Sequence, residues 1–276
     1  LSLENPTTEE RQLFQDSVAN AVNAAQLAVE DDPSESLNWR VLGQIYSTLT
    51  LAGVEGAYDR AVEAYSRAHT LDPQNPAIAL LQAQLESRSD NMEQARMYAE
   101  KSVSLKRNFT EALLFLSQID IIENNVSAAI ERTEAVISLE PNNPARYYQL
   151  GVLESSNENP ERAMAAFEYA VSLDNDYANA RYFLALGYAE QDRTDAALEQ
   201  LRVIQELNPD NEEIKLMITR LENGEPLAGT ETEATALDAS GTTFENEQSE
   251  APIAAETDLI SIEEETVDSD TTIQTE

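Results

Sequence analysis

A sequence pattern with a period of 34 residues runs through the middle of the chain and constrains its fold more than any other feature. One alanine recurs at this period: Ala61, Ala95, Ala129, Ala163 and Ala197. A glycine recurs in the segment before it, as at Gly43 and Gly151. Apolar residues at three- and four-residue steps on both sides predict two amphipathic helices per copy. We therefore expect residues 36–211 to form five consecutive helical hairpins.

Each recurring residue has a steric reason. Glycine inside a helix costs about 1 kcal/mol relative to alanine, so we expect a neighbouring helix to approach closely at Gly43 and Gly151. The recurring alanines are small for the same reason, since they allow a neighbouring helix to approach closely. Large side chains fill the space between helices, and we expect this of Trp39, Tyr65, Phe167 and Leu201. Prolines such as Pro73 and Pro209 end the second helix, because proline cannot continue it.

The first copy shows the pattern most fully, at Trp39, Leu42, Gly43, Tyr46, Ala61, Tyr65, Ala68 and Pro73. This pattern and period resemble the signature of the tetratricopeptide repeat (TPR) family. The resemblance implies an all-α protein, built as a right-handed α-solenoid of TPR helical hairpins. It also implies a surface for binding another molecule rather than a catalyst.

The period predicts the organisation of the chain. The expected segments are an N-terminal capping helix or partial repeat (1–35), TPR 1 (36–75), TPR 2 (76–109), TPR 3 (110–143), TPR 4 (144–177), TPR 5 (178–211), a C-terminal capping helix (212–224) and a disordered acidic tail (225–276). TPR 1 is longer than the others, and its additional residues fall at 51–56. Two glycines there indicate an ordered turn rather than a longer helix. The insertion is either a tolerated loop or a lip over one edge of a groove.

Two further helices are expected at the ends of the array. Residues 7–30 have one apolar face, formed by Leu13, Val18, Val22, Ala25 and Val29. The end of this helix matches the second helix of a repeat whose first helix is not recognisable. Residues 212–223 are expected to close the array, with four side chains inward: Ile214, Met217, Ile218 and Leu221. Gly224 and Pro226 end that helix.

The chain is strongly acidic, with 17 basic and 52 acidic residues and a net charge of −35. Residues 225–276 hold 15 acidic residues and no lysine or arginine, which predicts disorder. The remaining body has 37 acidic and 17 basic residues and a net charge of −20. Such a body repels nucleic acid and anionic lipid, so we expect neither partner for this segment. The alternative is that the charge only serves solubility.

Catalysis finds little support in the sequence. Cysteine is absent, which excludes disulfides, thiol catalysis and cysteine–metal sites. The single histidine, His69, lies near the expected end of a helix, where it favours the helix dipole. No glycine-rich phosphate-binding loop is present. We therefore expect no enzymatic activity, no cofactor and no metal site.

The TPR resemblance implies that the first helix of each hairpin lines a concave groove for a protein or an extended peptide. Mapped onto this chain, the groove residues are Arg40, Gln44, Leu80, Gln84, Leu114, Gln118, Tyr148, Val152, Tyr182 and Leu186. Glutamine both donates and accepts hydrogen bonds, which suits a peptide backbone. The apolar residues suit aliphatic anchors on a neutral or basic ligand. Only Arg40 fits the family's carboxylate clamp, which is therefore not expected. In the alternative, part of this apolar stripe packs between hairpins.

The wider context of the chain stays open. It begins at Leu1 rather than methionine, so we expect a processed or truncated piece of a longer protein. Residues 18–25, 38–43 and 54–58 resemble the C-terminal TPR region of bacterial O-antigen-ligase-like multi-pass membrane proteins. The sequence thus predicts a protein- or peptide-binding scaffold, with two alternatives. One is an accessory region tethered to a bacterial cell membrane through a missing N-terminal region. The other is a structural spacer with an empty groove, and a cytoplasmic location is equally open.

Overall fold

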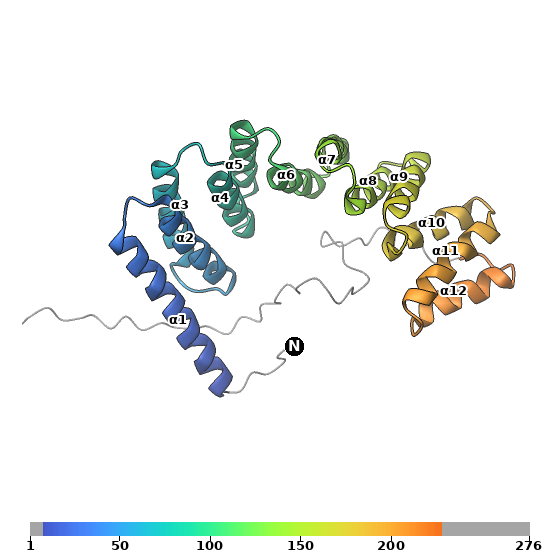
Figure 1. Ribbon diagram of the computed structural model, residues 1–276, viewed down its shortest axis with the longest axis horizontal. Helices are drawn as coiled ribbons and strands as arrows, with labels where there is room; N and C mark the ends of the chain where they lie inside the picture. The colour runs from blue at the N-terminus through green and yellow to red at the C-terminus, as the bar shows by residue number, and fades with distance from the viewer. Residues whose placement is uncertain (1–7, 228–276) are drawn as a thin grey trace, which may run out of the picture. The chain divides into compact units, whose positions relative to one another are not determined.

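The computed structural model describes residues 8–227, and within this range the chain forms twelve α-helices and no β-strand (Figure 1). Two compact units are distinguished, with the boundary between Asn91 and Met92. The all-α fold expected from the 34-residue period is confirmed. The boundary falls inside the second repeat, between its two helices.

The first unit contains four helices: α1 (Thr8–Asp31), α2 (Ser36–Leu51), α3 (Ala57–Leu71) and α4 (Pro76–Arg88). Helix α2 packs against α1, α3 and α4. The core of the first unit includes a cluster of buried residues, among them Leu42, Tyr46, Ala61, Tyr65 and Leu85. Helices α2 and α4 begin where a side chain satisfies a free backbone amide: Glu35 accepts from Leu37 N, and Asn75 accepts from Ala77 N.

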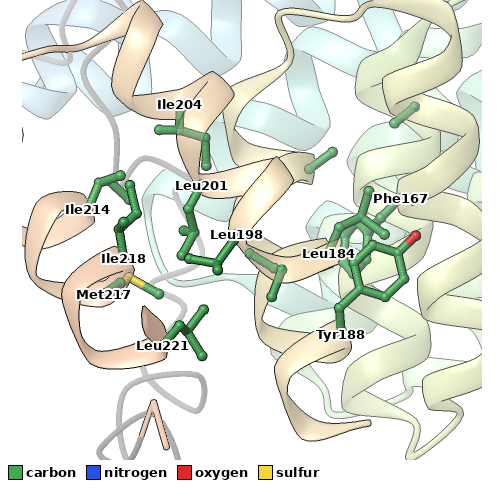
Figure 2. Packing of buried hydrophobic residues seen from close by; sticks show 14 of the residues in the cluster. Phe167, Leu184, Tyr188, Leu198, Leu201, Ile204, Ile214, Met217, Ile218 and Leu221 are labelled. Carbon is green, nitrogen blue, oxygen red and sulfur yellow. The ribbon is translucent and has the colours of Figure 1, made fainter. Parts of the chain in front are cut away.

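The second unit contains eight helices: α5 (Met92–Leu105), α6 (Thr110–Ile122), α7 (Val126–Leu139), α8 (Pro144–Ser156), α9 (Pro160–Leu173), α10 (Ala178–Glu190), α11 (Thr194–Leu207) and α12 (Glu212–Glu222). Each helix packs against the next one in sequence, as in a solenoid. The largest cluster joins α9 to α12, and Figure 2 shows Phe167, Leu184, Leu201 and Ile214 within it.

The close approaches expected at glycine are confirmed. A Cβ atom on Gly43 would lie 2.6 Å from the ring of Tyr65, and one on Gly151 would lie 2.5 Å from the ring of Phe167. The five recurring alanines are all buried, with exposed fractions of 2% or less: Ala61, Ala95, Ala129, Ala163 and Ala197. Tyr65, Phe167 and Leu201 are fully buried as expected, whereas Trp39 is only partly buried.

The turn between the two helices of a hairpin requires one residue in the left-handed region. Four such residues stand 34 apart, with φ of 58° to 60°: Asp90, Asn124, Glu158 and Asp192. None of them is glycine, although this conformation costs other residues about 1 kcal/mol or more. In the first hairpin two glycines, Gly53 and Gly56, take this role with φ of 71° and 70°.

The insertion in the first hairpin lengthens a helix as well as a turn. Helix α2 has 16 residues, whereas α4, α6, α8 and α10 have 13 each. The turn then covers residues 52–56, so the expectation of a turn at Leu51 was wrong. The helix continues because Leu49 is buried in the core, which stabilises the added turn.

The apolar face of α1 is covered from Val18 onward, since Val18 and Val22 already pack against the core of the first unit. Ala25 and Val29 are buried, whereas Leu13 is 68% exposed, so the expectation that Leu13 points inward was wrong. The reason is length: α1 has 24 residues and packs against α2, which has only 16. Ala21 is exposed as well, unlike its counterpart Ala61 in α3.

The closing helix agrees with the sequence. Its four expected inward residues are all buried: Ile214, Met217, Ile218 and Leu221. Gly224 adopts φ of 74°, and the Glu225 amide donates to the Arg220 carbonyl at 2.9 Å. Leu227 still packs against the core of the second unit. The predicted disordered tail lies outside the described residues from 228 onward.

Candidate functional site

The predicted groove residues lie on the first helix of each hairpin. We call this set of residues the first-helix face, with one part in each unit. The first-unit part is Arg40, Gln44, Leu80 and Gln84 on α2 and α4. The second-unit part is Leu114, Gln118, Tyr148, Val152, Tyr182 and Leu186 on α6, α8 and α10.

In the first unit, polar side chains make up the accessible part of the face. Gln44 is exposed, and Arg40 and Gln84 are partly buried. Leu80 was expected to anchor a ligand, but its exposed fraction is only 6%. For Leu80 the alternative interpretation therefore holds, because its side chain packs within the protein.

In the second unit, the face combines an exposed amide with partly buried apolar residues. Gln118 is exposed, and the other five predicted residues are partly buried. The Tyr148 ring lies among other aromatic rings, 5.6 Å from Tyr177, 5.9 Å from Phe183 and 6.0 Å from Phe167 between centroids. Burial raises the pKa of Tyr148 to about 12. Most of the Tyr148 side chain is therefore packed beneath the first-helix face, and only part of it is accessible.

The end of α6 carries an aliphatic pair at the twelfth and thirteenth positions of the third repeat, which the family pattern counts among its groove positions. Ile121 is 38% exposed and Ile122 is 53% exposed. The corresponding pairs in the next two hairpins are polar or small: 155–156 are two serines, and 189–190 are alanine and glutamate. Two neighbouring exposed aliphatic side chains that occur in one hairpin only indicate a contact with another molecule at that hairpin. This aliphatic pair can be found in the sequence.

A row of buried carboxylates fixes the first helices and was not predicted from the sequence. Glu86, Asp120 and Glu154 stand 34 residues apart, with exposed fractions of 8%, 0% and 0%. Equivalent positions in the first and last repeats hold Tyr46 and Tyr188. A buried carboxylate is costly unless it is paired and hydrogen-bonded, so each one requires local partners.

Those partners come from neighbouring helices within the same unit. In the first unit, Glu86 accepts hydrogen bonds from the Tyr58 hydroxyl at 3.0 Å and from Asn91 Nδ2 at 2.9 Å. In the second unit, Asp120 accepts from Arg96 Nη2 at 2.7 Å and from Arg132 Nε at 2.5 Å. Helix α6, which carries the exposed part of the face, is thereby tied to both α5 and α7.

Glu154 makes the equivalent link for α8. It pairs with Arg162 Nη1 on α9 at 2.8 Å and accepts from Asn159 Nδ2 at 3.1 Å. Arg162 Nη2 also reaches Glu134 on α7 at 2.6 Å. Arg96, Arg132 and Arg162 thus link the first helices α6 and α8 to the helices next to them.

Within residues 8–227, no group of three or more histidine, aspartate or glutamate side chains could hold a metal ion. Among the described helices, none is both long and apolar enough to cross a membrane. Two open surface depressions, of about 320 and 440 Å³, lie at the turns 192–196 and 140–144. Neither depression includes a predicted groove residue.

Comparison with known proteins agrees with this architecture. The family model described as "Tetratricopeptide repeat" matches residues 156–221. The "TPR repeat-containing protein YpiA" of Bacillus subtilis (strain 168) is 23% identical over 206 residues, covering 75% of this chain and 47% of the relative. The chain therefore spans about half the length of that relative. In its repeats and its fold, the chain is therefore similar to TPR proteins.

Solved structures show the same fold at low identity. The crystal structure of YrrB, titled "a TPR protein with an unusual peptide-binding site", is 18% identical; the match covers 72% of this chain and all of that one, with a TM-score of 0.55. Yeast Tom70 is 22% identical, with 80% of this chain and 44% of that one covered and a TM-score of 0.54. At such identities the likeness shows the fold alone. The resemblance to O-antigen-ligase-like proteins is not addressed by these relatives and stays a prediction.

Proposed function

We propose that this protein is a non-catalytic scaffold that binds an extended segment of another protein on its first-helix face. The TPR fold indicates a protein-binding scaffold. The observation that carries the finer proposal is the combination, on first helices of one unit, of the exposed Gln118, the exposed Ile122 and the partly buried Tyr182 and Leu186. A peptide backbone can pair with the amide while its side chains contact the apolar residues.

Charge supports a neutral or basic ligand. In a TPR the groove positions are the second, fifth, sixth, ninth, twelfth and thirteenth of each repeat, and repeats three to five place no lysine or arginine there. They place two carboxylates there, Glu111 and Glu190, both of which are exposed. A face without cations on an acidic body favours the approach of basic segments and disfavours acidic ones. Nucleic acid and anionic lipid are therefore unsuitable partners for this face.

The first unit carries polar groups on its own first helices. Arg40, Gln44 and Gln84 offer donors, and the two glutamines also offer acceptors. With Leu80 buried, we assign the apolar contacts of the ligand to the second unit alone.

The proposal can be tested by selecting peptides from a random phage-displayed library against the full 276-residue chain. Selected peptides are labelled with fluorescein, and their dissociation constants are measured by fluorescence polarisation. We expect Tyr182→Ala to raise the Kd about fivefold or more, equivalent to about 1 kcal/mol.

The matched control is Tyr169→Ala, since Tyr169 is 48% exposed but lies on a second helix, α9. Tyr169→Ala should leave the Kd within about twofold of the unmodified value. Equal effects of the two changes, or the failure to select any peptide, would refute the proposed function.

A further inference from the structure

The last described helix, α12, has the spacing and the buried side of a first helix. Ile214 follows Ala180 of α10 by 34 residues, and both are fully buried. Ile218 follows Leu184 by the same interval, with exposed fractions of 8% and 2%. Figure 2 shows Ile214 and Ile218 directed toward Leu201 of α11. Helix α12 is therefore docked in the same register as α10, and the two helices turn the same side inward.

The same interval places Leu216 at the position of Tyr182, Tyr148 and Leu114 on the earlier first helices. Those three residues are partly buried, whereas Leu216 is 52% exposed. It is the one large apolar residue of α12 that is exposed. A helix that only closes an array gains from a polar outer surface, and a leucine that stays half exposed gives up part of the stabilisation available from burial. Closing the core does not require a leucine here.

We propose that α12 continues the first-helix face and that Leu216 supplies a further apolar contact for the bound segment. This inference rests on the proposed function, because it extends the same face by one helix. The ligand would then lie along α6, α8, α10 and α12 of the second unit. It would place an additional aliphatic side chain against Leu216.

The charges on α12 suit the same class of ligand. Glu213 lies one turn before Leu216 and is exposed. Position 213 corresponds to 111 in the third repeat, where Glu111 is exposed as well. Arg220, one turn after Leu216, is the single cation at the equivalent positions of α12. A basic residue of the ligand would therefore lie on the Glu213 side of Leu216, away from Arg220.

The experiment uses the full chain and the fluorescein-labelled peptides selected as described above. Leu216→Ser removes the proposed contact. Its control is Leu207→Ser, because Leu207 is 46% exposed but ends α11, a second helix. We expect Leu216→Ser to raise the Kd about fivefold and Leu207→Ser to change it less than about twofold. Urea melts of both variants check that the closing helix stays folded.

The possible outcomes separate this inference from the proposed function. If Tyr182→Ala weakens binding while Leu216→Ser does no more than Leu207→Ser, then α12 is only a closing helix and the inference is wrong. If neither Tyr182→Ala nor Leu216→Ser weakens binding, the proposed function fails and this extension fails with it. A loss of binding that is specific to Leu216→Ser and Tyr182→Ala supports both.

Discussion

The ring of Phe167 occupies the space where residue 151 would carry a side chain: a Cβ atom on Gly151 would lie 2.5 Å from Phe167 Cε1. Because Phe167 is 2% exposed and packed on the other side, the ring has little room to move. We predict that Gly151→Leu destabilises the protein by several kcal/mol, as overpacking of a helix contact can.

The control for this change lies in the same helix. Ser155 of α8 is exposed, so Ser155→Leu should change the free energy of unfolding by less than about 1 kcal/mol. Urea melts measure both. If the two substitutions cost the same, then the assignment of residues to the inner and outer sides of α8 is wrong.

Asp120 provides a second stability test. Its carboxylate is fully buried and paired with Arg96 and Arg132, which are themselves partly exposed. We expect Asp120→Asn to cost about 2–3 kcal/mol, because two guanidinium groups would then face a neutral amide. Glu123 pairs with the same Arg96 at 2.6 Å but is 41% exposed, so Glu123→Gln should cost less than about 1 kcal/mol. A larger loss for Glu123→Gln than for Asp120→Asn would contradict this ranking.

Because of Tyr65, we expect the stability of the protein to fall at alkaline pH. Burial raises its pKa from the usual 10.0 to about 12. Below pH 10 the hydroxyl is protonated in both the folded and the unfolded chain. As the pH rises from 10 toward 12, the unfolded chain loses the proton first, so the free energy of unfolding falls.

The Tyr65→Phe variant isolates this contribution, because phenylalanine has no hydroxyl to ionise. Between about pH 9 and pH 11.5 the unmodified protein should lose about 1–2 kcal/mol more stability than the variant. Guanidinium melts at the two pH values give the comparison. Equal losses in both proteins would mean that Tyr65 ionises as readily in the folded state as in the unfolded chain.

The hairpin turns offer a stabilising substitution. Glu158 adopts φ of 58°, a conformation that glycine takes without steric cost. Glu158→Gly should therefore raise the free energy of unfolding by about 0.5–1 kcal/mol. Glu161, three residues later in the first turn of α9, has helical backbone, and Glu161→Gly should lower it by about 1 kcal/mol. Thermal melts that show the same sign for both would contradict the backbone argument.

The sequence predicted the hairpins because their requirements are local and repeat. Gly151 and Ala163 have small side chains for the same reason in every copy, and a period of 34 residues reveals it without any knowledge of the tertiary contacts. The exposure of Leu13 could not be predicted this way. It depends on where the shorter α2 ends relative to α1, which the pattern within α1 does not contain.

The site was less predictable than the fold. Aspartate and glutamate are usually exposed to solvent, so the sequence did not predict that Asp120 and Glu154 are buried. Their burial depends on Arg96 and Arg162, which lie in neighbouring helices. Leu80 was interpreted as a ligand anchor, yet its 6% exposure depends on how its neighbours pack. Spacing identifies the side of a helix, whereas the exposed fraction of each residue depends on the helices next to it.

If the first helices of the second unit bind the ligand, a reactive group on the ligand should reach them. The most direct measurement is photo-crosslinking of a selected peptide that carries a benzophenone group, followed by mass spectrometry of the adducts on the full chain. We expect adducts on α6, α8 and α10, at or next to Gln118, Ile122 and Tyr182. Adducts confined to the second helices α7, α9 and α11 would contradict this expectation.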